Sequence, residues 1–209
     1  MSRKVKKIFN AIKHPEKFIL FFSKKGLYKL FSDKFYIKCE YKNAFGKKLN
    51  LKNPQTYNEK LQWLKLYDRR PEYTTMVDKV AAKEYVAEKI GKEYIIPSLG
   101  VYDKFEDIDF DSLPNQFVIK CAHDSGGLVI CKDKSKLDLK EAEKKVKWSQ
   151  RRKYFYEHRE WPYKNVKPRI LIEKYMVEDE NVDDICLTDY KFFCFNGEPK
   201  IMYMSKDRG

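Results

Sequence analysis

A glycine-containing turn between two runs of strand-forming residues most constrains the fold of this 209-residue chain. Phe117–Cys121 and Leu128–Cys131 are rich in branched and aromatic side chains, which favour β-strands. The six residues between them are enough to reverse the chain, so the two strands are expected to pair antiparallel. The chain is therefore expected to build a sheet around this turn.

The turn itself offers groups that can bind phosphate. Gly126 and Gly127 let backbone N–H groups approach an anion closely. Lys120 adds a point charge from the incoming strand, Ser125 is a further donor, and His123 is within the same turn. A Gly-Gly turn fits an ordinary hairpin equally well, and the chain contains no Walker A motif, so both interpretations stay open.

Helices are expected on both sides of this strand pair. The segments are residues 3–32, divided at Pro15; Tyr57 to about Tyr67, begun by a capping box at Thr56–Glu59; Pro71 to Gly91; and Asp138 to about Lys153. Lys79 and Lys83 lie four residues apart in the third segment, which places them on one face of a continuous helix.

Further strands complete the pattern. They are Tyr94–Pro97, Arg169–Tyr175, Tyr190–Phe195 and Ile201–Met204. Asn196–Gly197 between the last two is a strong hairpin signal. Helices come first and mixed antiparallel strands follow, so the expected fold class is α+β, a helical N-terminal region followed by mixed antiparallel sheets with flanking helices.

Positive charge is concentrated near the N-terminus. Residues 1–60 hold 16 of the 44 Lys and Arg residues but 4 of the 31 acidic ones. Such a segment favours a polyanionic partner, whereas a specific nucleic-acid surface would spread the charge further. Residues 1–32 form a basic amphipathic pattern that suits an anionic membrane surface. The alternative is a helix that packs its aromatic side chains on the domain and leaves its lysines in water.

No run of about 18 apolar residues occurs, and the N-terminus lacks the apolar region and cleavage site of a signal peptide. The five cysteines include no C-x-x-C pair, which argues against a disulfide framework or a zinc ribbon. Cys121, Cys131 and Cys194 are expected to be small buried hydrophobic residues. The predicted location is cytoplasmic, peripheral at the inner face of the membrane.

Two other strand ends carry chemistry. Glu173–Met176 ends a buried strand with a carboxylate, an aromatic ring and a thioether, a set that can form an adenine slot or can simply be a sheet strand leaving the core. Asp189 and Lys191 share one strand face, where they can meet phosphate or form an exposed ion pair. Arg208 is a further candidate phosphate ligand. No nucleophilic triad and no metal cluster is evident, so catalytic residues stay unassigned.

Together these pieces resemble the TupA-like ATP-grasp family of teichuronopeptide, capsule and exopolysaccharide biosynthesis proteins. The resemblance covers about residues 50–209. Its matching stretches are Asn53–Trp63, Val77–Lys79, Ile96–Tyr102, Leu113–Cys121 with the following glycine-rich loop, Arg159–Tyr163, Glu173–Tyr175 and Asp189–Gly197.

The resemblance implies an ATP-grasp fold with a nucleotide between two α+β lobes. It implies that Lys120 binds phosphate, that His123–Gly127 closes over the triphosphate and that Glu173–Met176 forms the adenine hinge. Lys191 would face phosphate from the second lobe, and Lys79 matches an early lysine region. The candidate cofactor-binding residues are Lys79, Lys120, His123, Ser125, Gly126, Gly127, Glu173, Lys174, Tyr175, Met176, Lys191 and Arg208.

The chain departs from the family pattern at two places. The loop normally reads His-Gly-Ser-Gly-Gly, and Asp124 stands at the first glycine. A carboxylate beside phosphates costs Coulomb energy unless Lys or Mg²⁺ lies close. The chain ends at Gly209, before the residues that hold Mg²⁺ in the family, so its metal ligands are expected outside these residues and its second lobe is expected to be incomplete.

The expected divisions are a basic helical region at 1–52, a helical segment at 53–116, a nucleotide-binding lobe at 117–187 and the start of a second lobe at 188–209. The implied function is an ATP- and Mg²⁺-dependent carboxylate–amine ligase of surface polysaccharide assembly. It would act through an acyl phosphate on an acidic glycan or carboxylate substrate. The alternatives are a glycosyltransferase of the same process and a non-catalytic basic adaptor.

Overall fold

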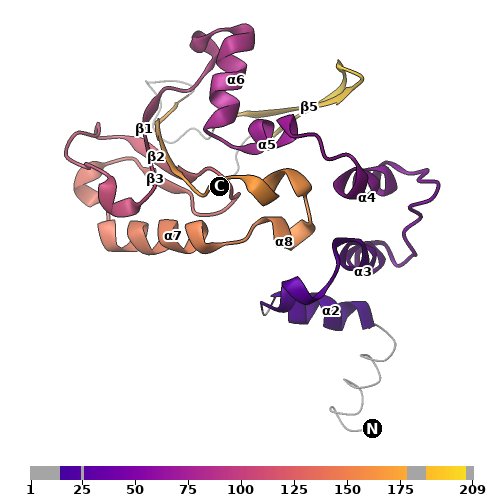
Figure 1. Ribbon diagram of the computed structural model, residues 1–209. Coiled ribbons are helices and arrows are strands. Elements are labelled where there is room, and N and C mark those ends of the chain that lie inside the picture. The colour runs from indigo at the N-terminus through magenta and orange to yellow at the C-terminus, as the bar shows by residue number, and fades with distance from the viewer. Residues whose placement is uncertain (1–14, 25, 178–186, 206–209) are drawn as a thin grey trace.

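The computed structural model describes residues 15–24, 26–177 and 187–205 (Figure 1). The helices are α2 Pro15–Lys24, α3 Asp33–Phe45, α4 Tyr57–Tyr67, α5 Glu72–Val77, α6 Ala81–Ile90, α7 Leu139–Arg151 and α8 Phe155–His158. The 3₁₀ turns are η1 Leu27–Leu30, η2 Lys92–Tyr94, η3 Phe105–Asp107, η4 Lys134–Lys136 and η5 Trp161–Asn165. The strands are β1 Ser98–Tyr102, β2 Phe117–Cys121, β3 Val129–Cys131, β4 Ile170–Lys174, β5 Asp189–Phe195 and β6 Glu198–Ser205.

The main sheet has four antiparallel strands in the order β1-β4-β2-β3. One face packs on α7, where Phe117 and Ile119 join Val146 in the main hydrophobic core. The other face packs near α5 and α6, where Leu171 meets Val80. Because both faces are covered, Ile170 to Glu173 of β4 are all buried. This layered arrangement confirms the expected α+β class and the pairing of β2 with β3 (Figure 1).

The predicted helix starts are confirmed where a side chain caps the backbone. Thr56 accepts a hydrogen bond from the N–H of Glu59, and the Glu59 carboxylate accepts one from the N–H of Thr56, so α4 begins with a complete capping box. Asp138 caps α7 by accepting from the N–H groups of Lys140 and Glu141.

The single helix predicted from Pro71 to Gly91 is wrong, because the structure has two helices with a break at Asp78. Helix α5 ends at Asp78, whose N–H makes the last hydrogen bond of that helix. Oδ1 of Asp78 accepts a hydrogen bond of 2.9 Å from the N–H of Val80, and α6 starts there in a new direction. Its Oδ2 pairs with Arg169 at 2.8 Å. Lys79 therefore lies in the break, and Lys79 and Lys83 do not share a helix face.

The strand predicted at Tyr94–Pro97 is also displaced. Residues 92–94 form η2, and β1 begins at Ser98, after Pro97. Proline has no N–H to give to a neighbouring strand, so pairing starts beyond it. The carbonyl of Pro97 still accepts a hydrogen bond of 2.9 Å from the N–H of Lys174.

The N-terminal helices attach to the sheet domain through Arg159, a residue with φ of +54° and 1% exposure. Its guanidinium lies 4.6 Å from the ring centroid of Tyr36 and 4.7 Å from that of Tyr156. It also donates to Asp33 Oδ1 at 3.2 Å and to the carbonyl of Tyr28 at 2.7 Å. One side chain thus joins α3 and η1 to α8.

The hairpin β5–β6 confirms the signal at Asn196–Gly197, whose φ angles of +53° and +82° suit a tight turn between twisted strands. The hairpin contacts the helices through the edge-to-face packing of Phe193 and Phe195 on Tyr57 of α4. With no second layer of described residues over it, the hairpin leaves Cys194 exposed, so the predicted burial of Cys194 is wrong, whereas Cys121 and Cys131 are buried as predicted.

Some predictions fall on residues outside the described ranges. These are the helix before Pro15 and the candidate ligand Arg208. Among the helices that the structure describes, none has the length and apolar character needed to cross a membrane.

Replacing Arg159 by lysine should lower the free energy of unfolding by about 2 kcal/mol, because lysine keeps the charge but cannot stack between two rings or donate as a fork. Arg69→Lys is the matched control, since Arg69 pairs with the same Asp33 from an exposed position at 3.6 Å. The control should stay within about 0.5 kcal/mol of the parent in urea unfolding. Equal losses in the two variants would contradict the anchoring role of Arg159.

Candidate functional site

Two lysines from different elements converge on one buried carboxylate. Glu173 of β4 is 4% exposed. Its Oε1 lies 2.6 Å from Nζ of Lys83 in α6, and its Oε2 lies 2.5 Å from Nζ of Lys120 in β2. Nζ of Lys83 also donates to the carbonyl of Ile96 at 2.5 Å. We refer to Lys83, Glu173 and Lys120 as the lysine–glutamate cluster.

Strand register explains why Lys120 and Glu173 meet. Glu173 lies opposite Val118, and Lys120 lies opposite Leu171, so all four side chains point to the sheet face that carries α6. Burial works to raise the pKa of the Glu173 carboxyl, but the two ammonium groups outweigh it and hold that pKa below its usual range. Glu173 is therefore ionised at neutral pH.

A cavity of about 620 Å³ opens beside Lys83. Its walls come from α6 and from the chain that leads into β1; besides Lys83, they are Glu84, Ala87, Glu88, Lys92, Ile95, Ile96, Pro97 and Ser98. This volume falls within the usual range for a small-molecule site. The hydrogen bond from Lys174 to Pro97 places the end of β4 against the same wall.

The glycine-rich loop between β2 and β3 is held from its inner side by Lys79. Nζ of Lys79 donates to the carbonyl oxygens of Cys121, at 3.2 Å, and of Asp124. The N–H of Lys79 donates to the carbonyl of Ala122. Burial lowers the pKa of Lys79. The ammonium of Lys79 is thus engaged with the loop backbone, and Lys79 supports the loop from beneath.

Asp124 points into the domain, and its carboxylate has two partners. It is 1% exposed, its carboxylate accepts from Ser149 Oγ at 2.5 Å, and Nη1 of Arg152 lies 2.8 Å from Oδ1 and 3.0 Å from Oδ2. The cation needed beside this carboxylate is therefore Arg152. The residue that departs from the family pattern ties the loop to the C-terminal end of α7.

Packing on α7 requires a glycine at position 127, and Gly126 also lies close to a side chain at the end of that helix. A Cβ at Gly127 would lie 2.3 Å from Cβ of Ser149, and the backbone there has φ of +67°. A Cβ at Gly126 would lie 2.6 Å from Nη1 of Arg152. Ser125 lies between Asp124 and the two glycines and is exposed, so the outer surface of the loop is open to solvent there.

His123 is buried, with its ring turned toward the end of α7. Nε2 lies 3.2 Å from the carbonyl of Arg152, and Nδ1 has no hydrogen-bond partner among the described residues. The ring must donate from Nε2 to that carbonyl, which leaves Nδ1 unprotonated. Burial lowers the pKa of His123.

The remaining candidates lie apart from this loop. Lys174 and Met176 are exposed and Tyr175 is half-buried at the end of β4, next to the lysine–glutamate cluster. Lys191 in β5 pairs with Asp189 at 2.8 Å, which confirms that these two share a strand face. Among the described residues, Lys191 and Lys120 pair with different carboxylates, those of Asp189 and Glu173.

The described residues do not fit a magnesium site. Residues 15–24, 26–177 and 187–205 contain no group of three or more His, Cys, Asp or Glu side chains that could hold a metal ion. The carboxylates nearest the lysines and the loop, those of Glu173 and Asp124, are already paired with cations. No metal ligand is assigned within these ranges.

Two members of this site were missed by sequence reasoning. Lys83 reaches Glu173 across 90 positions of the chain, and Arg152 reaches Asp124 across 28. A local pattern of residues carries no signal for such pairs. The acid at position 124 did give one clue, because a carboxylate in a phosphate-type loop demands a nearby cation.

The family model described as TupA-like ATPgrasp matches residues 59–209 of the chain. No curated protein and no solved structure matches it. The matched range contains the lysine–glutamate cluster, the glycine-rich loop and the hairpin β5–β6.

Gly127→Ala should destabilise the protein more than Gly46→Ala. Both glycines have φ near +67°, but a Cβ at Gly46 meets nothing within 4 Å. Gly46→Ala should therefore cost about 1 kcal/mol for backbone strain alone, and Gly127→Ala about 2 kcal/mol more for the clash with Ser149. Urea unfolding measures both, and a loss at Gly127 no larger than that at Gly46 would rule out packing as the reason for this glycine.

The two described imidazoles should titrate on opposite sides of the ordinary histidine pKa of about 6.5. His123 should titrate below it because of burial, and His158 above it because Nδ1 hydrogen-bonds to Glu40 at 2.6 Å. Because the pKa of His123 is lower in the folded chain than in the unfolded chain, the unfolded chain takes up this proton at a higher pH. His123 should therefore lower the free energy of unfolding on acidification. Histidine NMR titration tests the order, and the reverse order would contradict the burial of His123.

Proposed function

Because the chain belongs to the TupA-like ATP-grasp family, we propose that it binds ATP with its phosphates at the lysine–glutamate cluster and against the outer surface of the glycine-rich loop. The observation that carries this proposal is the convergence of Lys83 and Lys120 on buried Glu173. Membership of the family supports ATP as the ligand, and the cluster of positive charge supports the proposed position of its phosphates in the fold.

The charge balance of the cluster favours an anion. Two ammonium groups and one carboxylate leave one positive charge, and each ammonium has three N–H donors. Both lysines pair with Glu173 and Lys83 also donates to the carbonyl of Ile96, so N–H donors remain for phosphate oxygens. The carboxylate also fixes where the ammonium groups lie, which reduces the entropy lost when a phosphate binds.

The glycine-rich loop is suited to lie over the phosphates because its inner contacts are already made. Lys79 and Arg152 hold its backbone and Asp124 from the inner side. Ser125 faces solvent at the outer side and can donate its hydroxyl and N–H to a phosphate. In this proposal Lys79, His123 and the two glycines shape the loop, and Lys120 and Ser125 contact the nucleotide.

The adenine is proposed to lie at the end of β4. The carboxylate of Glu173 is engaged with lysines, so the base would meet the backbone of Lys174 and the side chains of Tyr175 and Met176. The cavity beside Lys83 and Pro97 gives the adjacent volume. Lys191 and Arg208 are proposed to approach the phosphates from the other side.

The proposed reaction is that of a carboxylate–amine ligase in surface polysaccharide assembly. A carboxylate oxygen of an acidic glycan or other carboxylate substrate attacks the γ-phosphorus of ATP, and the bond to the leaving ADP oxygen breaks. An amine then attacks the carbonyl carbon of the acyl phosphate, loses a proton and expels inorganic phosphate, which leaves an amide. Lys120 and Lys83 would stabilise the negative charge on the transferring group.

Lys120→Gln and Lys83→Gln should each weaken ATP binding about 10- to 100-fold, the usual worth of a charge-assisted hydrogen bond. Lys140→Gln is the matched control, because Lys140 is an exposed lysine of α7 without a role in the site. Isothermal titration calorimetry with ATP and Mg²⁺ measures the affinities, and thermal unfolding shows that each variant is folded.

A folded parent protein that binds no ATP in this titration would overturn the proposed function. Parent-like affinity in both lysine variants would leave ATP binding intact and overturn the position of the phosphates. A preference for UDP-sugars over ATP in thermal-shift measurements would replace the ligase by a glycosyltransferase.

A further inference from the structure

Helix α2 turns polar side chains toward the rest of the protein and aromatic side chains toward solvent. Glu16 and Ser23 are buried, and Glu16 pairs with Lys42 of α3 at 3.0 Å. Phe18, Phe21 and Phe22, which lie three and four residues apart, are exposed on the outer side. The three rings are thus 42–56% exposed, whereas the sequence alternative had them packed on the domain.

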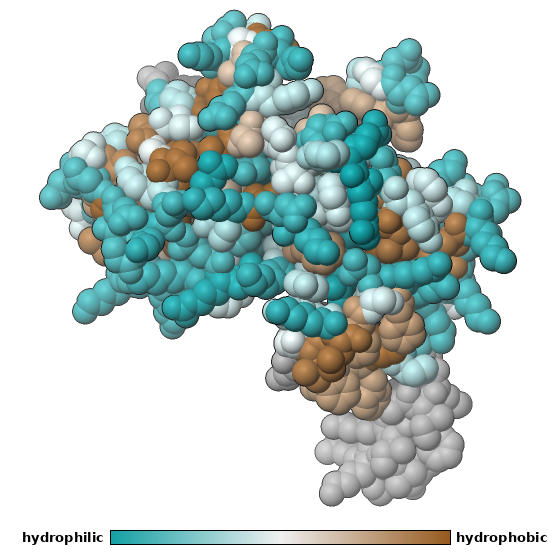
Figure 2. Space-filling view, in the orientation of Figure 1, coloured by the Kyte–Doolittle hydropathy of each residue, from teal (hydrophilic) through white to brown (hydrophobic). Residues whose placement is uncertain are grey.

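The exposed rings form part of one apolar patch. Phe22 contacts both of the other rings, with centroids 6.2 Å from Phe18 and 5.6 Å from Phe21. Leu27 and Leu30 are exposed on η1, which packs against α2, and we count them with the rings. Figure 2 shows these apolar side chains gathered over α2 at the lower end of the described molecule. We refer to these five residues as the α2 patch; an exposed group of this kind marks a contact surface.

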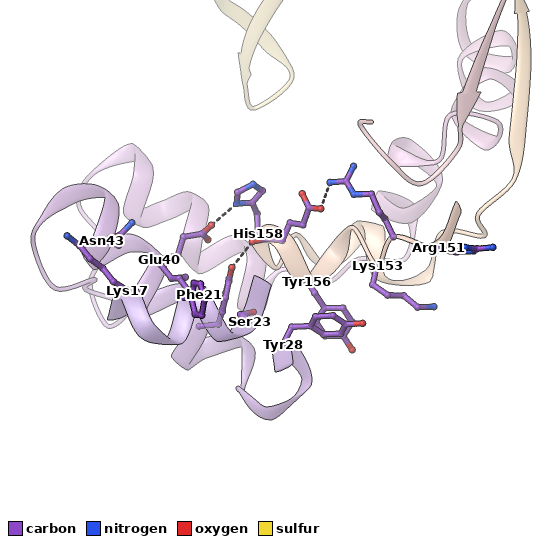
Figure 3. A pocket seen from close by; sticks show the side chains of 14 residues that line it. Lys17, Phe21, Ser23, Tyr28, Glu40, Asn43, Arg151, Lys153, Tyr156 and His158 are labelled. Carbon is purple, nitrogen blue, oxygen red and sulfur yellow. Dashed lines mark hydrogen bonds and ion pairs between the residues drawn. The ribbon is translucent and has the colours of Figure 1, made fainter. Parts of the chain in front are cut away.

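A cavity of about 810 Å³ adjoins the α2 patch and shares Phe21 with it. We call it the cationic cavity because Lys17, Arg151, Arg152 and Lys153 outnumber Glu40 and Glu157 in its lining. Lys17 lies on one side of this cavity, and Arg151 and Lys153 lie on the other, with the stacked rings of Tyr28 and Tyr156 between them (Figure 3). None of these three cations forms an ion pair with an acidic side chain in the described part of the chain. They are available to an external anion.

We propose that the α2 patch lies on an anionic phospholipid surface and that the adjoining cavity receives an acidic lipid headgroup. The rings would enter the boundary between headgroups and acyl chains, and Lys17, Arg151 and Lys153 would meet the phosphates. This inference concerns a different face from the nucleotide site and does not depend on ATP binding.

Charge complementarity selects this occupant over two others. A soluble acidic glycan would satisfy the cations but leave the phenylalanines in water. A second copy of the chain would cover the phenylalanines but bring two strongly basic segments together, since residues 1–60 hold 16 basic and 4 acidic side chains. An anionic bilayer satisfies both the apolar and the cationic parts of the surface.

The test is co-sedimentation of the full chain with vesicles of phosphatidylcholine, with or without phosphatidylglycerol. We expect binding to the mixed vesicles that weakens with salt, and little binding to pure phosphatidylcholine. Phe21→Ala should weaken binding about tenfold. The matched control is Phe192→Ala in the hairpin, since Phe192 is 59% exposed against 56% for Phe21.

The cavity is tested separately by the double variant Arg151→Gln, Lys153→Gln. Each lost cation should weaken binding to anionic vesicles about fivefold, so the pair should weaken it about 25-fold. The matched control removes two exposed lysines of the same helix, Lys140→Gln with Lys144→Gln, and should bind like the parent.

Three results would overturn the proposal. Equal binding to neutral and anionic vesicles would exclude a role for the cationic cavity. Absence of vesicle binding together with a dimer that Phe21→Ala dissociates would assign the patch to a second copy of the chain. Absence of vesicle binding with tight binding of an oligogalacturonate to the parent, lost in the double cavity variant, would assign the cavity to an acidic glycan.

Discussion

The ionised carboxylate of Glu173 is the constraint on which the site depends. A buried carboxylate without partners would cost several kcal/mol, and Lys83 and Lys120 remove that cost by enclosing it from α6 and β2. The same contacts tie α6 to the central strand of the sheet. They also place two ammonium groups side by side, which no apolar packing could achieve. Stability and a phosphate-type site therefore arise from the same three side chains.

The glycine-rich loop follows a similar logic. Its inner side is occupied by structural partners: Lys79 on the backbone, and Arg152 with Ser149 on Asp124. Residues that resemble phosphate ligands in a linear sequence are thus partly used to shape the loop. Arg152 also pairs with Glu157 at the edge of the cavity beside α2, so the loop and that cavity are joined through one guanidinium.

The features that sequence predicted well are local in the chain. The capping box at Thr56, the turn at Asn196–Gly197 and the pairing of β2 with β3 each depend on residues less than about 15 positions apart. The features that it missed depend on distant partners. Asp78 broke a predicted helix because Arg169 and its own backbone hold it, and Lys83 became a site residue because β4 brings Glu173 beneath it. The outward rings of α2 were unpredictable for the same reason, since Lys42 draws Glu16 inward.

The most direct test of the central claim is a crystal structure of the chain with a non-hydrolysable ATP analogue. The account predicts phosphate oxygens within hydrogen-bond distance, about 3 Å, of Nζ of both Lys83 and Lys120, with Glu173 still between the two ammonium groups. A nucleotide bound elsewhere, with these lysines paired to Glu173 and remote from any phosphate, would contradict it.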